Sequence, residues 1–116
     1  MKTLIVLNDP PYGTERTYNG LRLAGSLSRQ EGVEVRIFLI GDAVSSAKTG
    51  QTVPNGYYNV ERMIGAVVRH GGVIGVCGSC MDARGLRDGE LVQGARRSSM
   101  DELTAWTIEA DKTVVF

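Results

Sequence analysis

Two cysteines three positions apart, Cys77 and Cys80, are the residues of this chain best suited to chemistry. They follow a short apolar run, and Gly78 and Ser79 lie between them. A thiol acts as a nucleophile or a metal ligand only in its thiolate form, so groups that lower its pKa decide its role. Backbone N–H groups in a turn after a strand favour such an anion. Arg84 would add to this effect if its side chain folded back toward the thiol.

Three kinds of chemistry fit this pair. In the first, the Cys77 thiolate accepts a sulfur atom as a persulfide and passes it on. In the second, Cys77 and Cys80 form a disulfide by exchange, since the spacing suits a small ring. In the third, the pair is half of a zinc site, but zinc takes four ligands and only His70 remains as a further soft ligand. We therefore expect no metal or other cofactor. A cysteine at a strand end can also be no more than a small apolar side chain.

Apolar runs alternate with helical patterns along the chain. Short, continuous runs rich in β-branched residues are typical of parallel strands that are buried on both faces. The patterns predict helices over about 14–30 and 60–70 and from Ser99 on, and strands over residues 3–7, 33–40, 73–76 and 113–116. Together they predict an α/β sandwich of three layers, with helices on both faces of a mostly parallel sheet of four or five strands.

Polar residues mark the predicted helix starts. Thr14 and Asn59 are N-cap candidates, and Ser99 with Glu102 forms a capping box. The last helix is expected to bury its inner face, which comprises Leu103, Trp106, Thr107 and Ala110. Between residues 78 and 94 we expect a turn of helix and one very short strand, and the adjoining Arg96-Arg97 is predicted to be a solvated pair.

The carboxyl ends of parallel strands are where α/β proteins place their sites. Asp9, Asp42 and Cys77 each follow a predicted strand, so all three are candidates for one edge of the sheet. Aspartates at such positions more commonly cap turns, which is the alternative role for Asp9 and Asp42. The long polar stretch 42–58 contains a short helical turn and is otherwise expected to be a lid or a subunit contact.

Composition narrows the choice of partners. The 116 residues predict a single domain spanning 1–116, and thirteen basic residues balance thirteen acidic ones. No basic patch stands out, so nucleic acid and anionic membranes are not expected partners. No stretch resembles a signal peptide or a membrane span, and we expect the protein to be cytoplasmic, where close cysteines are usually reduced.

The order of these segments resembles the DsrE/DsrF-like family of small sulfur-relay proteins, which is related to the TusD type. The resemblance extends over nearly the whole chain. It rests on LIVLNDPPYG, RIFLIGDAV, GVCGSCMDARG and ELTAWTIEADKTVVF, above all on the Gly41-Asp42 turn, the cysteine eight residues before Gly85, and the closing Trp106 to Phe116 segment. It implies a flavodoxin-like fold of the DsrE type.

The resemblance also implies a function. Within the family, the cysteine that ends the third strand and precedes an Arg-Gly pair accepts sulfur, and the matching residues here are Cys77 and Arg84. It further implies a homo-oligomer, commonly a trimer or a hexamer, that exchanges sulfur with donor and acceptor proteins and needs no cofactor. This chain departs from many members in carrying Cys80, which could resolve a persulfide into a disulfide. A thiol-disulfide redox protein and a non-catalytic oligomeric binding subunit therefore remain the alternatives.

Overall fold

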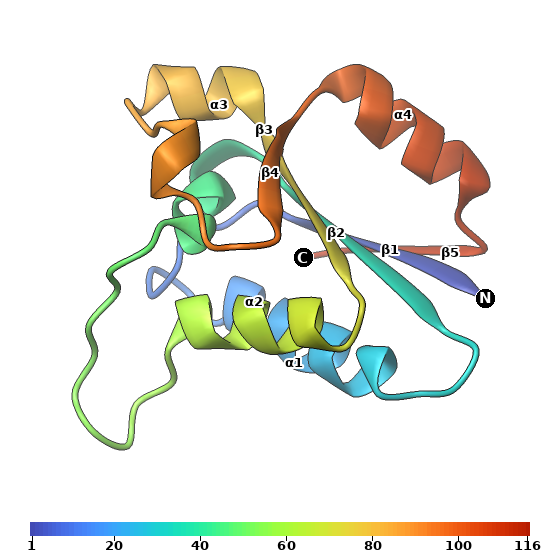
Figure 1. Cartoon of the computed structure of the whole chain (residues 1–116), viewed down its shortest axis with the longest axis horizontal. Helices are drawn as coiled ribbons and strands as arrows, with labels where there is room; N and C mark the ends of the chain where they lie inside the picture. The colour runs from blue at the N-terminus through green and yellow to red at the C-terminus, as the bar shows by residue number, and fades with distance from the viewer.

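Five parallel strands form the centre of the protein (Figure 1). The computed structural model describes residues 1–116, and the sheet has the strand order β4-β3-β2-β1-β5. Every neighbouring pair of strands is parallel. The strands are β1 (Lys2–Leu7), β2 (Glu34–Leu39), β3 (Val73–Cys77), β4 (Ala95–Ser98) and β5 (Lys112–Val115).

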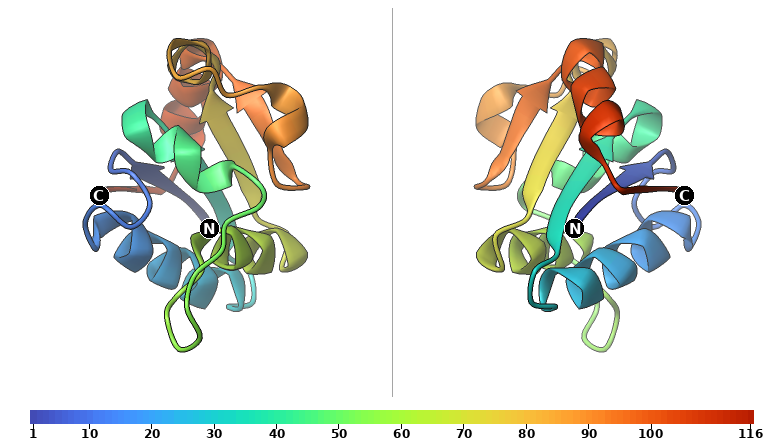
Figure 2. Two further views of the ribbon diagram at one scale, coloured as in Figure 1. Left: turned by 90° about the vertical axis from the view of Figure 1, so that its left-hand side faces the viewer. Right: turned by 90° about the vertical axis from the view of Figure 1, so that its right-hand side faces the viewer.

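Helices cover both faces of this sheet, so the predicted three-layer α/β sandwich is confirmed (Figure 2). On one face, α1 (Arg16–Ser28) and α2 (Val60–Arg69) lie side by side. On the other face lies α4 (Met100–Glu109), while α3 (Gly78–Ala83) continues directly from β3. Two short 3-10 helices, η1 (Gly41–Ala47) and η2 (Asp88–Glu90), complete the structure. No helix is long and apolar enough to cross a membrane.

The core forms where the sequence has its continuous apolar runs. The central strands carry many side chains that are fully buried, including Leu4, Ile5, Leu7, Ile37, Phe38, Leu39, Ile74 and Val76. Residues in a parallel strand covered on both faces have no polar side to show, which explains why these runs do not alternate. On α2, the buried positions Val60, Ile64 and Val67 follow helical spacing, and the Asn59 side chain accepts a hydrogen bond from the N–H of Arg62 at 3.0 Å.

Two of the predicted helix starts differ in detail. Glu15, not Thr14, occupies the N-cap of α1. The Thr14 hydroxyl donates instead to Asp9 at 2.6 Å and accepts from the N–H of Arg16 at 3.2 Å. Ser99 caps α4 as predicted, with the N–H of Glu102 donating to its hydroxyl at 3.2 Å. The Glu102 carboxylate does not complete a capping box, because it is bound by the Arg96 guanidinium and by the Ser98 hydroxyl.

The strand β4 is the main element that the sequence pattern does not predict. Its residues Ala95–Ser98 form the edge of the sheet; a very short strand is expected in the region after Cys77, but the sequence does not locate it here. Arg96 and Arg97 are exposed to solvent as predicted, and both side chains are in addition held in ion pairs. An edge strand with two arginines has no buried face of its own. Its sequence therefore lacks the apolar periodicity by which a strand is predicted.

Trp106 attaches α4 to the sheet. It is the only residue of the predicted inner face that is buried, and Thr107 is exposed. Its ring meets that of Phe38 edge-to-face at 6.2 Å, and a side chain at Gly75 would collide with it. The guanidinium groups of Arg36 and Arg96 lie over the same indole at 5.4 and 5.8 Å. One aromatic side chain therefore holds most of this layer in place.

We expect Trp106→Ala to reduce the free energy of unfolding by about 3–5 kcal/mol, the usual loss when a buried large aromatic is truncated. Thr107→Ala on the same helix is the matched control, because that side chain is exposed and should change stability by no more than about 0.5 kcal/mol. Urea unfolding followed by circular dichroism measures both. Equal effects of the two substitutions would contradict the role given to Trp106.

Candidate functional site

Cys77 is the last residue of β3, and the chain turns into α3 immediately after it. The turn leaves no room for a side chain at Gly78. A Cβ there would lie 2.8 Å from Nη1 of Arg97 and 3.1 Å from the carbonyl oxygen of Ser98. With glycine at this position, β4 approaches the junction closely and Ser98 pairs with Cys77 across the sheet.

The Cys77 side chain is 6% exposed and borders a cleft of about 340 Å³. Its sulfur lies 3.4 Å from the hydroxyl oxygen of Ser79. The cleft is lined by the β3–α3 junction, the end of β4 and the start of α4, namely Cys77, Gly78, Ser79, Asp82, Arg97, Ser98, Ser99 and Met100. The thiol is thus largely covered by protein but borders an open cleft.

Hydrogen bonds favour the thiolate at Cys77. Burial by itself would raise the pKa of this thiol, because a charge is less well solvated inside the protein. The Cys80 thiol, the Ser79 hydroxyl and the backbone N–H groups of both residues donate to the sulfur and outweigh that effect. The pKa of Cys77 is consequently held below its ordinary value, which is the condition for a nucleophilic thiol.

Cys80 has the opposite character. Burial, the hydrogen bond to Cys77 and the negative charge there together raise the pKa of the Cys80 thiol. Two interactions oppose them: the N–H of Gly41 donates to the Cys80 sulfur at 3.2 Å, and the positive charge of Arg84 lies nearby. Gly41 lies at the end of β2 with a φ of +60°, a conformation that favours glycine. Cys80 therefore holds its proton more tightly than Cys77 and is the hydrogen-bond donor of the pair.

Arg84 and Asp42 lie beside Cys80. The Arg84 guanidinium donates from Nε and Nη2 to one carboxylate oxygen of Asp42, at 2.9 and 2.7 Å. Its Nη1 donates to the backbone carbonyl of Cys80 at 3.2 Å. The positive charge of Arg84 acts to lower the pKa of Cys80 and is not among the groups that shift Cys77. The structure thus brings Arg84 and Asp42 to the edge of the site, on the Cys80 side.

Asp9 is engaged elsewhere. Its carboxylate accepts a hydrogen bond from Thr14 and lies 3.8 Å from the guanidinium of Arg16. It follows β1, which is separated from β3 by β2 and hence by about 10 Å of sheet. Of the three strand ends expected at one site, only those of β2 and β3 come together, and Asp9 acts as a turn residue.

Arg97 is the contributor that sequence reasoning missed. It lines the cleft, and its guanidinium donates to Asp82, to Asp88 and to the backbone carbonyl of Gly78. Its hydrogen bonds to the carboxylates of Asp82 and Asp88 raise the pKa of Arg97, so it stays charged. Recognition of β4 would have identified this residue and Ser98, because parallel pairing places the end of β4 beside Cys77.

Neither the histidine nor the long loop joins the site. His70 ends α2, where its Nδ1 lies 2.8 Å from the carbonyl oxygen of Ala66. No three His, Cys, Asp or Glu side chains are grouped so as to hold a metal ion. The stretch after η1 extends away from α3 (Figure 1), and no residue of 42–58 lines the cleft at Cys77.

Known proteins share this fold, a five-stranded parallel α/β sandwich that here carries two neighbouring thiols near its carboxyl edge. The model of the DsrE/DsrF-like family matches residues 1–116, and the chain belongs to this family. It is similar to protein YchN of Escherichia coli strain K12, with 37% identity over 99% of this chain and 98% of YchN. Protein MJ0989 of Methanocaldococcus jannaschii is 38% identical over the full length of both chains.

Solved structures agree with this assignment. The crystal structure of YchN from Escherichia coli superimposes with a TM-score of 0.94 at 37% identity, covering 100% of this chain and 99% of that one. MTH1491 from Methanobacterium thermoautotrophicum, at 11% identity, gives a TM-score of 0.77 over 99% of this chain and 98% of its own. The second likeness establishes the fold alone.

We expect Cys77 to react with iodoacetamide at a lower pH than Cys80, because the alkylation rate follows the thiolate fraction. Removing one donor in Ser79→Ala should raise the midpoint of the Cys77 profile, whereas Ser26→Ala, an exposed serine on α1, should leave it unchanged. Peptide mapping by mass spectrometry across a pH series gives both profiles. A Cys77 midpoint equal to or above that of Cys80 would contradict this account.

Proposed function

We propose that this protein carries sulfur as a persulfide on Cys77 within a sulfur relay. The observation that carries the proposal is the Cys77 thiol at the end of β3, hydrogen-bonded on several sides so that its pKa falls, and bordering a cleft. Membership of the DsrE/DsrF-like family supports the same chemistry. In this proposal Ser79, Cys80 and the turn that begins at Gly78 stabilise the thiolate, while Arg84 and Asp42 hold Cys80 in place.

The transfer is an exchange between sulfur atoms. The Cys77 thiolate attacks the outer sulfur of a donor persulfide, R–S–SH. The donor's S–S bond breaks as a new S–S bond forms at Cys77, and the donor leaves as the thiolate R–S⁻. Electrons and atoms balance without an external oxidant, and the reverse reaction with an acceptor thiolate unloads the protein.

The cleft suits such an exchange with another protein. Its walls near the thiol are the hydroxyl-bearing Ser79, Ser98 and Ser99, and the side chain of Met100 is 60% exposed at its border. A partner can therefore bring a cysteine to Cys77 from this side. The family further supports a homo-oligomer, with a trimer or a hexamer expected, and the exposed apolar Ile108 and Val115 on α4 and β5 fit an interface between copies.

Mass analysis after incubation with inorganic polysulfide tests the proposal. We expect wild type and Cys80→Ser to gain the mass of one sulfur atom at Cys77, and Cys77→Ser to gain none there. The matched pair of serine variants separates a dedicated acceptor from general thiol reactivity. Similar labelling of both variants, or of neither, would overturn the proposal and favour a non-catalytic oligomeric binding subunit.

A second function, thiol-disulfide exchange, is favoured by one observation: the Cys80 thiol is hydrogen-bonded to Cys77. In that reaction the Cys80 thiolate attacks Sγ of the Cys77 persulfide. The Cys77–Cys80 disulfide forms, the outer S–S bond breaks, and HS⁻ leaves. Burial, the largest cause of the raised pKa of Cys80, persists when Cys77 carries a persulfide, so this resolution is restrained near neutral pH.

We therefore expect sulfide release from the loaded protein to accelerate as the pH rises through the pKa of Cys80. The persulfide of Cys80→Ser should persist across the same range, because it has no resolving thiol. Sulfide released from polysulfide-loaded, desalted protein at pH 7 to 10 measures the effect. A rate independent of pH, or equal in Cys80→Ser, would show that Cys80 is not the resolving residue.

A further inference from the structure

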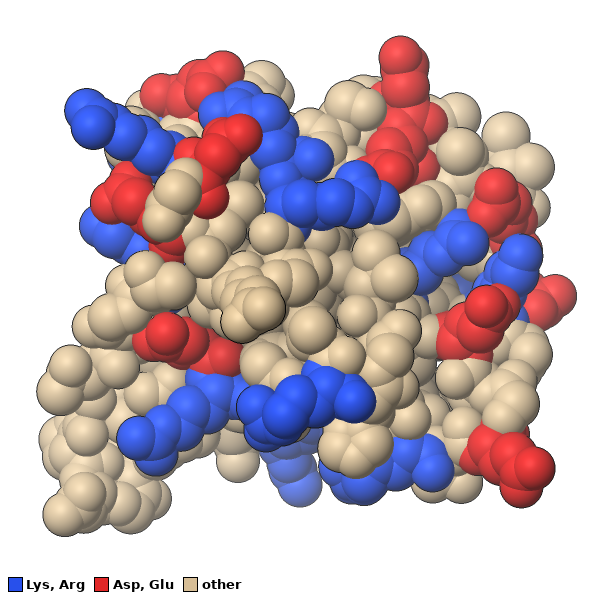
Figure 3. Space-filling model, viewed as in Figure 1, with Lys and Arg blue, Asp and Glu red and all other residues tan.

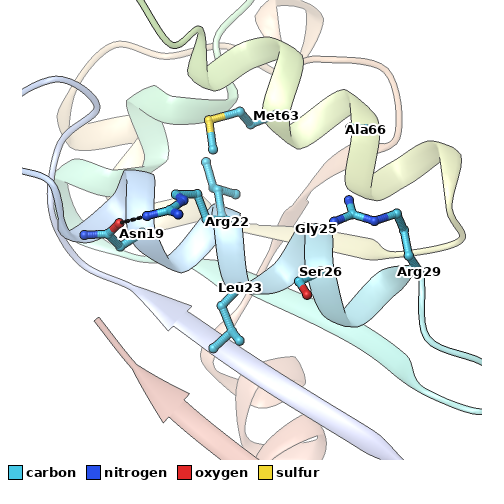
Figure 4. Close-up of a pocket in the computed structure, with 9 residues that line it drawn as sticks. Asn19, Arg22, Leu23, Gly25, Ser26, Arg29, Met63 and Ala66 are labelled. Atoms are coloured by element: carbon cyan, nitrogen blue, oxygen red, sulfur yellow. Dashed lines mark hydrogen bonds between the residues drawn. The ribbon is translucent and has the colours of Figure 1, made fainter.

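The largest cavity of the molecule lies far from the thiols, on the surface formed by α1 and α2. It has a volume of about 610 Å³ and is lined by nine residues, none of which is acidic. Figure 4 shows Arg22 and Arg29 at its two ends on α1, with Met63 and Ala66 of α2 beside them. We refer to this cavity, with the arginines that border it, as the arginine groove.

Two arginines, Arg22 and Arg29, line this groove, and two more, Arg62 and Arg69, lie near it on α2. Arg22 and Arg29 lie four residues before and three residues after Ser26, which lines the groove. Arg62 and Arg69 stand at the same offsets from Ala66 on α2, so helix geometry puts them on the side of α2 that faces the groove. All four side chains are exposed.

None of these four guanidinium groups takes part in an ion pair. Arg22 is bound only to neutral groups. Its guanidinium donates to the side-chain amide oxygen of Asn19 at 3.2 Å and lies over the Tyr18 ring at 5.6 Å. By contrast, ion pairs hold Arg16, Arg36, Lys48, Arg84, Arg96 and Arg97. Figure 3 shows the result: blue side chains gather along the edge formed by α1 and α2, whereas blue and red are interleaved over α3 and α4.

Glycines shape the groove in the same way on both helices. Each C-terminal guanidinium lies over a glycine four positions earlier. A Cβ built at Gly25 would lie 3.7 Å from Nη1 of Arg29, and one at Gly65 would lie 3.3 Å from Nη1 of Arg69. The charged groups therefore lie close to the helix surface, and the partly exposed Leu23, Met63 and Ala66 line the space between them, whereas Leu21 is buried beneath it.

We propose that the arginine groove binds an acidic segment of a partner protein, with apolar side chains of that segment seated between α1 and α2. Charge complementarity identifies the partner as anionic, because four cations here lack counter-charges. The apolar lining favours a protein segment over nucleic acid, whose backbone offers no side chain to fill it. The short length of the cationic surface, two helical turns, also favours a peptide.

Fluorescence anisotropy with a labelled peptide, acetyl-EELLEELLEE-amide, tests the proposal on the full chain. We expect wild type to bind it, and Arg22→Glu/Arg29→Glu to lose about tenfold or more in affinity, since two attractions become repulsions. The control Arg87→Glu/Lys112→Glu makes the same change in net charge at exposed residues outside the groove and without ion pairs. It should bind within about twofold of wild type.

Further probes distinguish the alternatives. A peptide with serine in place of leucine should bind more weakly, and an oligouridylate of equal charge more weakly still. Tighter binding of the oligouridylate through the same arginines would overturn the proposal in favour of nucleic acid. Equal loss in both charge-reversed variants would overturn it as non-specific attraction. If Arg22→Glu/Arg29→Glu instead changes the oligomeric state in sedimentation, the groove is an interface between copies and the proposal fails.

Polysulfide loading of Cys77 should be unaffected by Arg22→Glu/Arg29→Glu, so this test is independent of the test of sulfur carriage.

Discussion

The close approach of β4 to the junction between β3 and α3 is the constraint on which the site depends. Parallel pairing sets Ser98 beside Cys77, and Arg97 reaches across to the carbonyl of Gly78. Only glycine fits beneath that contact. The chain then turns within one residue, and the turn aims the N–H groups of residues 79 and 80 at the sulfur. Most of the stabilisation of the thiolate thus comes from the backbone and from short side chains, not from a long, flexible cation.

The two thiols have distinct roles because they compete for one proton. A second thiolate beside the first would place two negative charges in contact, so the protons leave in two separated steps. Hydrogen-bond donors around Cys77 lower its pKa, so this residue loses its proton first, whereas burial keeps the proton on Cys80. Cys80 is then a hydrogen-bond donor in the resting state and a nucleophile only after deprotonation. In the proposed persulfide chemistry, the burial that keeps the proton on Cys80 would also limit how soon a persulfide on Cys77 is resolved.

The sequence predicts those parts of the structure that depend on apolar burial. The continuous runs locate β1, β2 and β3, and the helical spacing locates α2, because each buries enough apolar surface to leave a pattern. It does not predict β4, whose pairing partner, not its own composition, makes it a strand. The sequence predicts that Arg84 lies near the cysteines, but it does not predict the ion pair between Arg84 and Asp42. Such a pair depends on which acceptors the tertiary structure brings within reach of the long arginine side chain. Asp9 shares a sheet edge with Cys77, but the width of β2 keeps them apart.

The distribution of charge over the surface is a second feature that the sequence does not predict. Thirteen cations and thirteen anions give a neutral total, from which an even distribution is expected. The structure instead pairs charges around α3, β4 and α4, where long-range contacts fix the strands, and leaves Arg22, Arg29, Arg62 and Arg69 on the α1–α2 face without ion pairs. Net charge is a sum and carries no information about this arrangement. Because the arginine groove and the cleft at Cys77 have no residue in common, a partner held at the groove leaves the thiol accessible. Partner recognition and the proposed sulfur exchange would then use separate parts of the protein surface.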